Sequence, residues 1–187
     1  MTLREGGRPV RTAMFLIALA ATAFSDNSGT RDECVDCTLD RELLWPPNHK
    51  LVNVGLHVDV HQDPGATHET TITVYSDEDD VWPASAQFSP DAKLEDGKLR
   101  LRSERSGPGD GRVYLIVVSV LDTDNTTGDS HVHLCVFTVV VPHDLSAASI
   151  ASVEAQADAA HDFFVANGAP PSGYFLVGDG PVIGPKQ

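Results

Sequence analysis

The sequence predicts an all-β fold, a sandwich of antiparallel sheets, from three observations. Residues 51–61 alternate between apolar and polar side chains, the pattern of a strand with one buried face. Residues 70–75 are rich in β-branched and aromatic types, which are typical of a second strand. Gly- and Pro-rich segments separate about five or six such runs, and this spacing favours a sandwich over a helical bundle.

The alternation also predicts which side chains are buried. In residues 51–61 the inward positions are Val52, Val54, Leu56, Val58 and Val60. In residues 98–104, Leu99 and Leu101 are expected to face the core. The positions between them, which are expected to face water, are Lys98, Arg100 and Arg102.

Two longer apolar runs complete the predicted sheets. Residues 112–121 are almost continuously apolar, which predicts a central strand covered on both faces. Residues 131–141 are apolar on both faces as well and predict a further strand. The Gly-rich segment 106–111 between the strands at 98–104 and 112–121 has the composition of a hairpin loop.

The first residues have the features of a secretory signal. Arg4, Arg8 and Arg11 precede an apolar run, Ala13–Phe24, and Ala21-Thr22-Ala23 resembles a cleavage site. The run holds 12 residues, too few to cross a bilayer of about 30 Å as a helix. We therefore predict a signal peptide at residues 1–23 and no membrane span after its removal, with a buried helix or an anchor as the alternatives.

The pattern changes after residue 144. Residues 146–166 are rich in Ala, and Ile150, Val153, Ala157, Ala160 and Phe164 recur at near-helical spacing. Asp144 or Ser146 is a candidate N-cap, and Gly168 follows the predicted end. The predicted organisation is a flexible leader at residues 24–42, a sandwich at 43–144, a helix at 145–168 and a flexible tail at 169–187.

The segment before the first strand contains Leu44, Trp45 and two prolines. The prolines fix an extended path and remove two ladder donors, so the segment is expected to lead into the strand. Leu44 and Trp45 are expected to lie beneath the sheet, and truncation of a core Trp45 to Ala would cost about 3–5 kcal/mol.

The three cysteines are Cys34, Cys37 and Cys135. An odd number in an exported chain leaves one thiol over. A structural disulfide is the preferred interpretation, and a bond between Cys34 and Cys37 is slightly favoured over one from either of them to Cys135. Zinc binding by the Cys34–Cys37 pair is the alternative.

The formal net charge of −14 argues against two classes of partner, nucleic acid and anionic lipid. Binding to nucleic acid needs clustered Lys and Arg to neutralise phosphates, and binding to anionic lipid has the same requirement. An acidic surface is suited to solubility outside the cell or to the capture of cations.

Two acidic segments are candidate calcium ligands. One contains Asp77, Asp79 and Asp80, together with Glu78, and the other contains Asp122, Asp124 and Asn125, followed by Asp129. Loops supply calcium with six to eight oxygen ligands, and two such loops at one pole of a sandwich could share an ion. The alternative is that both segments are solvated turns, because Asp and Asn are good turn formers.

Histidines offer a second metal hypothesis. His131 and His133 lie on one face of a predicted strand, about 7 Å apart, and could chelate zinc if a third ligand approached. His57 and His61 lie on another strand and are too far apart to share an ion without a further strand between them. A polar outer face is the preferred interpretation of all four.

The string Leu44-Trp-Pro-Pro-Asn-His-Lys50 before a Val-alternating strand, and the later string Leu99-Arg-Leu-Arg-Ser-Glu-Arg-Ser-Gly-Pro-Gly-Asp-Gly-Arg-Val-Tyr114, are distinctive. With the ending Val-Val-Val-Pro-His-Asp144, the chain resembles immunoglobulin-like domains of secreted bacterial proteins, similar to hyalin-repeat and fibronectin-type-III-like modules. The resemblance covers about residues 43–144 and implies an immunoglobulin-like sandwich in an extracellular setting. It brings no catalytic residues.

These observations predict a secreted or cell-surface module that is not an enzyme and that binds an extracellular protein or polysaccharide, with calcium as a candidate stabiliser. Two alternatives stay open. One is a metal-dependent hydrolase, or an accessory module of an exported hydrolase. The other is a structural spacer.

Overall fold

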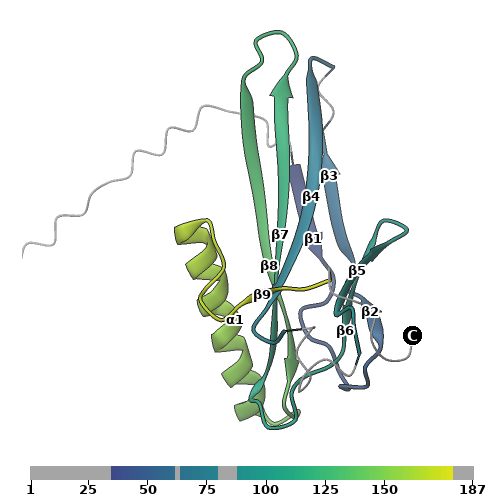
Figure 1. Ribbon diagram of the computed structural model, residues 1–187, viewed down its shortest axis with the longest axis vertical. Helices are drawn as coiled ribbons and strands as arrows, with labels where there is room; N and C mark the ends of the chain where they lie inside the picture. Colours follow the sequence, from purple (N-terminus) through teal and green to yellow (C-terminus); the bar gives the residue numbers. More distant parts are fainter. Residues whose placement is uncertain (1–34, 62–63, 80–87, 179–187) are drawn as a thin grey trace, which may run out of the picture. The chain divides into compact units, whose positions relative to one another are not determined.

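The computed structural model describes residues 35–61, 64–79 and 88–178 (Figure 1). All of them belong to one unit, Asp32–Gln187. The elements are β1 (Val35–Leu39), β2 (Leu51–Asn53), β3 (Leu56–Val60), β4 (Ala66–Ser76), β5 (Ala92–Glu95), β6 (Lys98–Arg102), β7 (Gly111–Asp124), β8 (Ser130–Pro142), α1 (Ala147–Asn167) and β9 (Phe175–Leu176).

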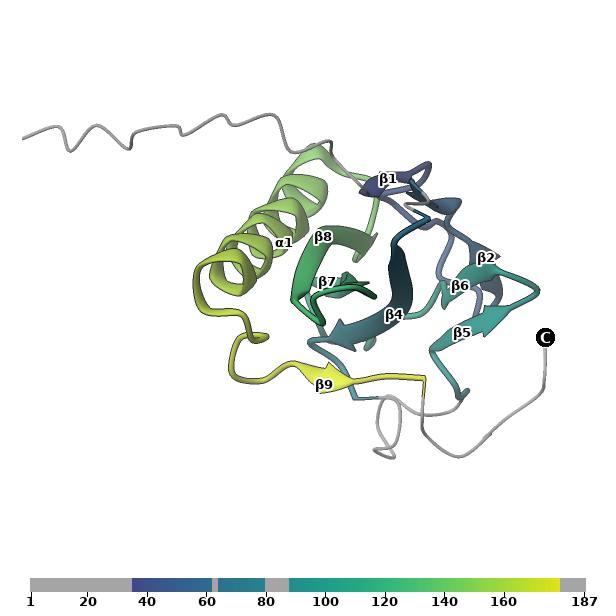
Figure 2. The same ribbon diagram turned by 90° about the horizontal axis from the view of Figure 1, so that it is seen from above.

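Every strand pair in this part of the chain is antiparallel. The sheets have the strand orders β8-β7-β4-β9, β2-β6-β5 and β1-β3. Viewed from above, α1 lies outside β8 and β7, whereas β2, β5 and β6 lie on the opposite side of β4 (Figure 2). The predicted β architecture with a C-terminal helix is confirmed at this level.

Strand β7 is central, because each of its faces packs against a different layer. Its alternate residues Tyr114, Ile116, Val118 and Val120 belong to the main core with β2, β3 and β6 side chains. The intervening residues Val113, Leu115 and Val117 pack with buried residues of α1. The prediction of a strand covered on both faces is therefore confirmed for this run.

Helix α1 begins and ends where its capping residues predict. The Ser146 side chain accepts a hydrogen bond from the Ser149 amide, and Gly168 has left-handed backbone angles at the C-terminal end. The buried helix residues are Val153, Ala157, Ala160 and Phe164. Among the described residues no helix is both long and apolar enough to cross a membrane.

Close packing of α1 depends on Gly111, at the start of β7. A Cβ at this position would lie 2.8 Å from Cγ2 of Val153 and 3.0 Å from the carbonyl oxygen of Val141. Its φ of +138° is also one that residues with a side chain rarely adopt. The last Gly of the Ser106–Gly111 segment thus allows the helix to approach the sheet.

Three features of the fold differ from the sequence-based expectations. Segment 106–111 is not a hairpin loop, because β6 pairs with β2 and β5 while β7 pairs with β4 and β8, so the segment crosses between sheets. The strand expected over 51–61 is divided at Gly55, whose φ is +67°. The short strand β5 had no clear alternating signal in the sequence.

Both ranges predicted to be flexible contain paired strands in their described parts. Val35, Cys37 and Leu39 of β1 pack against the main core, and β1 pairs with β3 over its whole length. After α1, β9 pairs with Tyr75 and Ser76 of β4. The predicted signal peptide, Cys34 and the last nine residues lie outside the described part of the chain.

Candidate functional site

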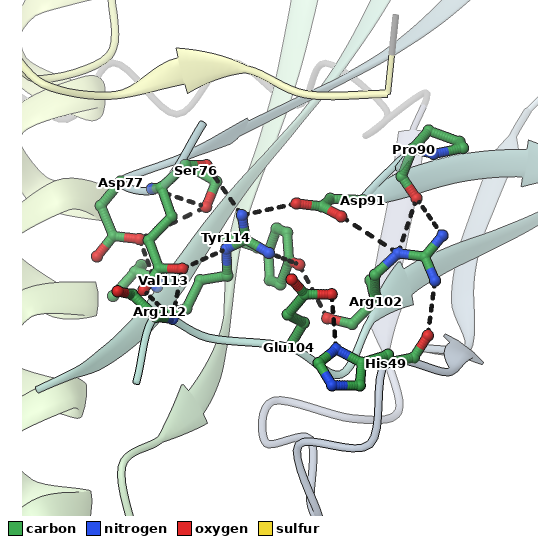
Figure 3. A network of polar contacts seen from close by, with 12 residues as sticks. His49, Ser76, Asp77, Pro90, Asp91, Arg102, Glu104, Arg112, Val113 and Tyr114 are labelled. Carbon is green, nitrogen blue, oxygen red and sulfur yellow. Dashed lines mark hydrogen bonds and ion pairs between the residues drawn. The ribbon is translucent and has the colours of Figure 1, made fainter. Parts of the chain in front are cut away.

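Two arginines and an aspartate form the centre of a polar cluster at one end of the main core (Figure 3). Asp91 Oδ1 lies 3.2 Å from Arg102 Nε, and Asp91 Oδ2 lies 2.7 Å from Arg112 Nη2. The exposed fractions of these residues are 0%, 1% and 0%. Because an unpaired buried charge costs several kcal/mol, each of the three requires the others to remain charged inside the protein.

Arg102 uses its remaining donors on backbone carbonyls. Its Nη1 donates to the carbonyl of His49 at 2.6 Å, while Nε and Nη2 donate to the carbonyl of Pro90 at 3.2 and 2.9 Å. The expectation that Arg102 faces water is wrong, because the segments around His49 and Pro90 cover that face of β6. Leu99 and Leu101 face the core as predicted.

Arg112 connects Asp91 to the end of β4. Its Nη1 donates to the hydroxyl of Tyr114 at 2.9 Å, and its Nη2 donates to the carbonyl of Glu78 at 3.1 Å. Burial opposes the charged form, but the oxygens of Tyr114, Asp91 and Glu78 raise the pKa of Arg112, so the guanidinium stays ionised. Burial raises the pKa of Tyr114, which stays protonated and donates to the carbonyl of Arg102 at 2.8 Å.

Two carboxylates fix the crossover between β6 and β7. Asp77 Oδ1 accepts from the Val113 amide at 2.9 Å, and the Glu78 oxygens accept from the Ser106 amide at 2.9 and 2.8 Å. Desolvation by burial raises the pKa of both side chains, against the lowering effect of those amides and of Arg112. We call Asp77, Glu78, Asp91, Arg102, Arg112 and Tyr114 the buried ion cluster.

The Trp-Pro-Pro-Asn-His segment meets the cluster from the other side. His49 Nδ1 lies 2.9 Å from Glu104 Oε2, and Ser103 Oγ donates to the carbonyl of Pro46 at 2.7 Å. Leu44 is buried, with 2% exposed, but Trp45 is 41% exposed, so the prediction of a core Trp45 is wrong. The prolines direct the neighbouring carbonyls inward while the indole lies at the surface.

This arrangement makes the residues of both distinctive strings contact one another. Arg102 and Arg112 of the second string pair within the cluster, and Ser103 and Glu104 contact Pro46 and His49 of the first. The chemistry that these contacts perform is structural: they join β4, β6, β7 and the segments around His49 and Pro90. Buried charged groups that are held by ion pairs and hydrogen bonds in this way favour one packing arrangement.

The two acidic segments do not lie at one pole. Ala66 of β4 pairs with Asp124 and Ser76 pairs with Tyr114, so Asp77 and Asp124 lie at opposite ends of β4. At about 3.3 Å per residue from Ala66 to Asp77, they are about 36 Å apart. A calcium ion shared by the two segments is therefore excluded, and Asp80 lies outside the described residues.

The side chains of both segments have other partners. Asp124 Oδ1 accepts from the amides of Thr126 and Thr127 at 2.6 and 3.0 Å, and Asn125 Oδ1 accepts from Thr67 at 2.8 Å. These are the contacts of a turn. Calcium binding by either segment alone stays a prediction.

Of the candidate histidines, His131 lies beside Asp122, whereas His57 and His61 do not. Asp122 pairs with His68 of β4 on one side and with His131 of β8 on the other, and His68 Nε2 lies 3.5 Å from Asp122 Oδ1. His57 and His61 instead face Asp40 and Asp36 at the surface. Within residues 35–61, 64–79 and 88–178, no group of three His, Cys, Asp or Glu side chains could hold a metal ion.

The disulfide joins Cys37 of β1 to Cys135 of β8, across a sequence separation of 98 residues. The favoured bond between Cys34 and Cys37 is therefore wrong. Both residues pack against the main core, and the bond therefore ties the β1–β3 sheet to the sheet of β8. The bond is consistent with an oxidising compartment, either extracellular or periplasmic.

Sequence reasoning identified Asp77 and the acidic Glu78 but missed Asp91, Arg102, Arg112 and Tyr114. One signal was available: Arg112 opens an otherwise continuous apolar run that predicts burial on both faces. A charged residue there needs a partner of opposite charge.

Comparison with known proteins finds no matching family model, no matching curated protein and no matching solved structure. The resemblance to secreted immunoglobulin-like modules thus stays a prediction from the two distinctive strings.

Proposed function

We propose that this chain is an exported, immunoglobulin-like binding or adhesion module that performs no catalysis. The observation that carries the proposal is the buried ion cluster. Arg102 and Arg112 of the second distinctive string hold segments of the fold together, and the Asp91 carboxylate between them is 0% exposed. A module of this kind interacts through its surface instead of through a reactive cleft.

Two features support export. The N-terminal segment has the pattern of a signal peptide, and the Cys37–Cys135 bond suits an oxidising compartment. The acidic composition suits a soluble extracellular domain. The proposed partner is an extracellular protein or polysaccharide.

The competing functions make different demands. A metal-dependent hydrolase needs bound metal and a reactive water, which His131 and His133 would have to support. A spacer needs stability and no ligand. Calcium as a stabiliser stays a separate prediction, now restricted to one acidic segment at a time.

The test uses the purified chain from residue 24 onward with its disulfide intact. Retention on isolated cell envelopes and on immobilised extracellular polysaccharides is measured as a function of protein concentration. In parallel, bound metal is quantified by mass spectrometry, and turnover is assayed with chromogenic esters, phosphoesters, glycosides and peptides.

Saturable retention without turnover supports the binding module. Turnover that disappears in His131→Ala or His133→Ala, together with stoichiometric zinc, would overturn it in favour of the hydrolase. Absence of saturable retention on every surface would favour the spacer.

A further inference from the structure

A groove of about 540 Å³ lies between the outer strands of two different sheets. One wall is formed by residues 71–75 of β4 and the other by Ala92, Lys93 and Leu94 of β5, with Leu99 between them. The C-terminal residues Leu176, Val177 and Gly178 close one end. Leu94 and Leu176 are 57% and 49% exposed, so large apolar side chains border the groove without being covered.

The edge of β4 that faces this groove is only partly paired. Strand β9 pairs with Tyr75 and Ser76, and the Val177 amide donates to the carbonyl of Val74 at 3.0 Å. Beyond Val74, toward Ala66, no described strand pairs with this edge of β4. A row of unpaired backbone donors and acceptors is a template for another strand.

The parity of β4 identifies the groups on that edge. The carbonyl of Val74 faces β9. The register of β4 with β7 is constant from Ala66 to Ser76, so no bulge interrupts the alternation. Because the amide and carbonyl of one residue point to the same edge and successive residues alternate, Ile72 presents its groups to the groove and Thr70 presents its groups to the same edge just beyond it. The intervening residues pair with β7.

The geometry favours a single extended strand as the occupant. Both walls offer an unpaired edge among the described strands, because β5 pairs only with β6, and β9 pairs with β4 only at Tyr75 and Ser76 and at the Val74 carbonyl. A second sheet or a helix would need more width than one strand, whereas one extended segment can pair with β4 and cover Leu94. Its inward side chains would meet Ile72, Val74 and Leu99 and are therefore expected to be Val, Ile or Thr.

The outward side chains of such a strand are also constrained. Glu69 is exposed on β4 and lies on the face opposite to the inward residues. Opposite charges in neighbouring cross-strand positions attract, and the net charge of −14 draws cations toward this chain. Lys or Arg is expected at an outward position of the occupant.

We propose that the free edge of β4, from Thr70 to Ile72, together with the groove beside β5, binds an extended segment of a partner protein by strand addition. The segment carries β-branched residues inward and a basic residue outward. This site deepens the proposed binding function and rests on it. It continues the pairing that β9 makes at the same edge.

The test is a titration of the ¹⁵N-labelled chain with a blocked heptapeptide, acetyl-Thr-Val-Lys-Val-Thr-Val-Lys-amide. The amides of Thr70 and Ile72 are expected to shift most and to exchange more slowly with deuterium. A peptide of the same sequence with N-methylated valines cannot form the ladder and is the matched control on the ligand. Equal binding of both peptides would overturn strand addition.

Thr70→Pro removes the edge donor without touching the ladder with β7, and Pro is tolerated on such an edge. This variant should bind the peptide at least about tenfold more weakly, while Thr70→Val, which keeps the amide, should bind within about twofold of the parent. Glu69→Gln should weaken binding about twofold at low salt. Unchanged affinity of Thr70→Pro, with its fold verified by circular dichroism, would contradict the site.

The same spectra distinguish the partner segment from two other possible occupants of this edge, a second copy of the chain and the chain's own last residues. Shifts of Thr70 and Ile72 that grow with protein concentration alone, with a dimer in sedimentation, would assign the edge to a second copy and overturn the proposal. Shifts of these amides in a variant ending at Gly178 would assign it to the chain's own last residues, with the same consequence. If the parent chain shows saturable retention on envelopes but does not bind the peptide, the strand-addition site is overturned while the proposed binding function stands.

Discussion

The two ends of the β4–β7 pair both carry acidic residues, yet the structure uses them in opposite ways. At one end Asp77 and Glu78 lie within the buried ion cluster and contact Val113, Ser106 and Arg112. At the other end Asp124 lies in the exposed turn between β7 and β8, where it accepts two backbone amides. We call residues 124–129 the β7–β8 tip.

The comparison shows that burial, and not residue type, decides what an aspartate contributes. A buried carboxylate must be paired, and its loss leaves opposite charges uncompensated. An exposed carboxylate in a turn contributes one or two hydrogen bonds that compete with water. The same substitution should therefore have very different consequences at the two ends.

The largest effect is expected for Asp91→Asn. The change removes the negative charge between Arg102 and Arg112 and leaves both guanidinium groups buried, at a cost of about 3–5 kcal/mol. Equilibrium denaturation with urea, monitored by Trp and Tyr fluorescence, measures this loss.

Asp129→Asn at the exposed β7–β8 tip is the matched control, because it makes the same chemical change outside the cluster. It should alter the free energy of unfolding by less than about 0.5 kcal/mol. If both variants lose the same amount, the ion cluster does not hold the fold as we describe.

The disulfide should be the next largest contributor. Replacing Cys37 and Cys135 together by Ser releases a loop of 98 residues and should cost about 2–5 kcal/mol. Because the bond ties β1 to β8 at a distance from the ion cluster, hydrogen exchange should accelerate in β1 and β3 while the amides of Val113 and Ser106 stay protected. Uniform acceleration would show that the two regions are not independent.

The strands and the helix could be predicted from the sequence because burial of one face makes apolar residues recur at a regular spacing. The alternation over 51–60 and the caps of α1 at Ser146 and Gly168 are local signals, and the structure follows them. Arg102 and Trp45 were misplaced because their environments are formed by segments distant in sequence. Arg102 is covered by His49 and Pro90, which are 53 and 12 residues away.

The candidate site shows the same limit more strongly. The acidic segments were visible in the sequence, but whether they share a pole depends on the register of β4 with β7, which no local pattern specifies. Pairing of Cys37 with Cys135 likewise depends on β1, whose five residues gave no distinct signal beside the polar residues that precede it.

The pKa values of the carboxyl groups should also be shifted in opposite directions at the two ends. Burial raises the pKa of Asp77 and Glu78 above the ordinary values of 3.8 and 4.5, so their ionisation disfavours the fold. Their contribution is therefore most favourable below those values and declines as the pH rises through the folded-state pKa. Amides of Thr127 and Thr126 lower the pKa of Asp124, so its contribution is present above 3.8 and is lost as the pH falls.

Carboxyl ¹³C chemical shifts measured from pH 2 to 8 resolve these titrations residue by residue. Asp77 and Glu78 should titrate above, and Asp124 below, the corresponding residues of an unfolded reference peptide. A depressed pKa at Asp77 or Glu78 would mean that the amides and Arg112 outweigh burial, and the cluster would then gain stability from ionisation.

The smallest effect is expected for Asp124→Ala at the β7–β8 tip. Loss of the two hydrogen bonds from Thr126 and Thr127 should lower the melting temperature only slightly, because both bonds lie at an exposed turn and compete with water. The variant also tests the remaining calcium hypothesis, because Asp124 is a candidate ligand of the tip. If the tip is only a turn, calcium should leave the melting temperatures of the parent and the variant unchanged. If calcium instead raises the melting temperature of the parent and Asp124→Ala abolishes that rise, the β7–β8 tip binds the ion. The two acidic ends would then differ in ligand as well as in burial.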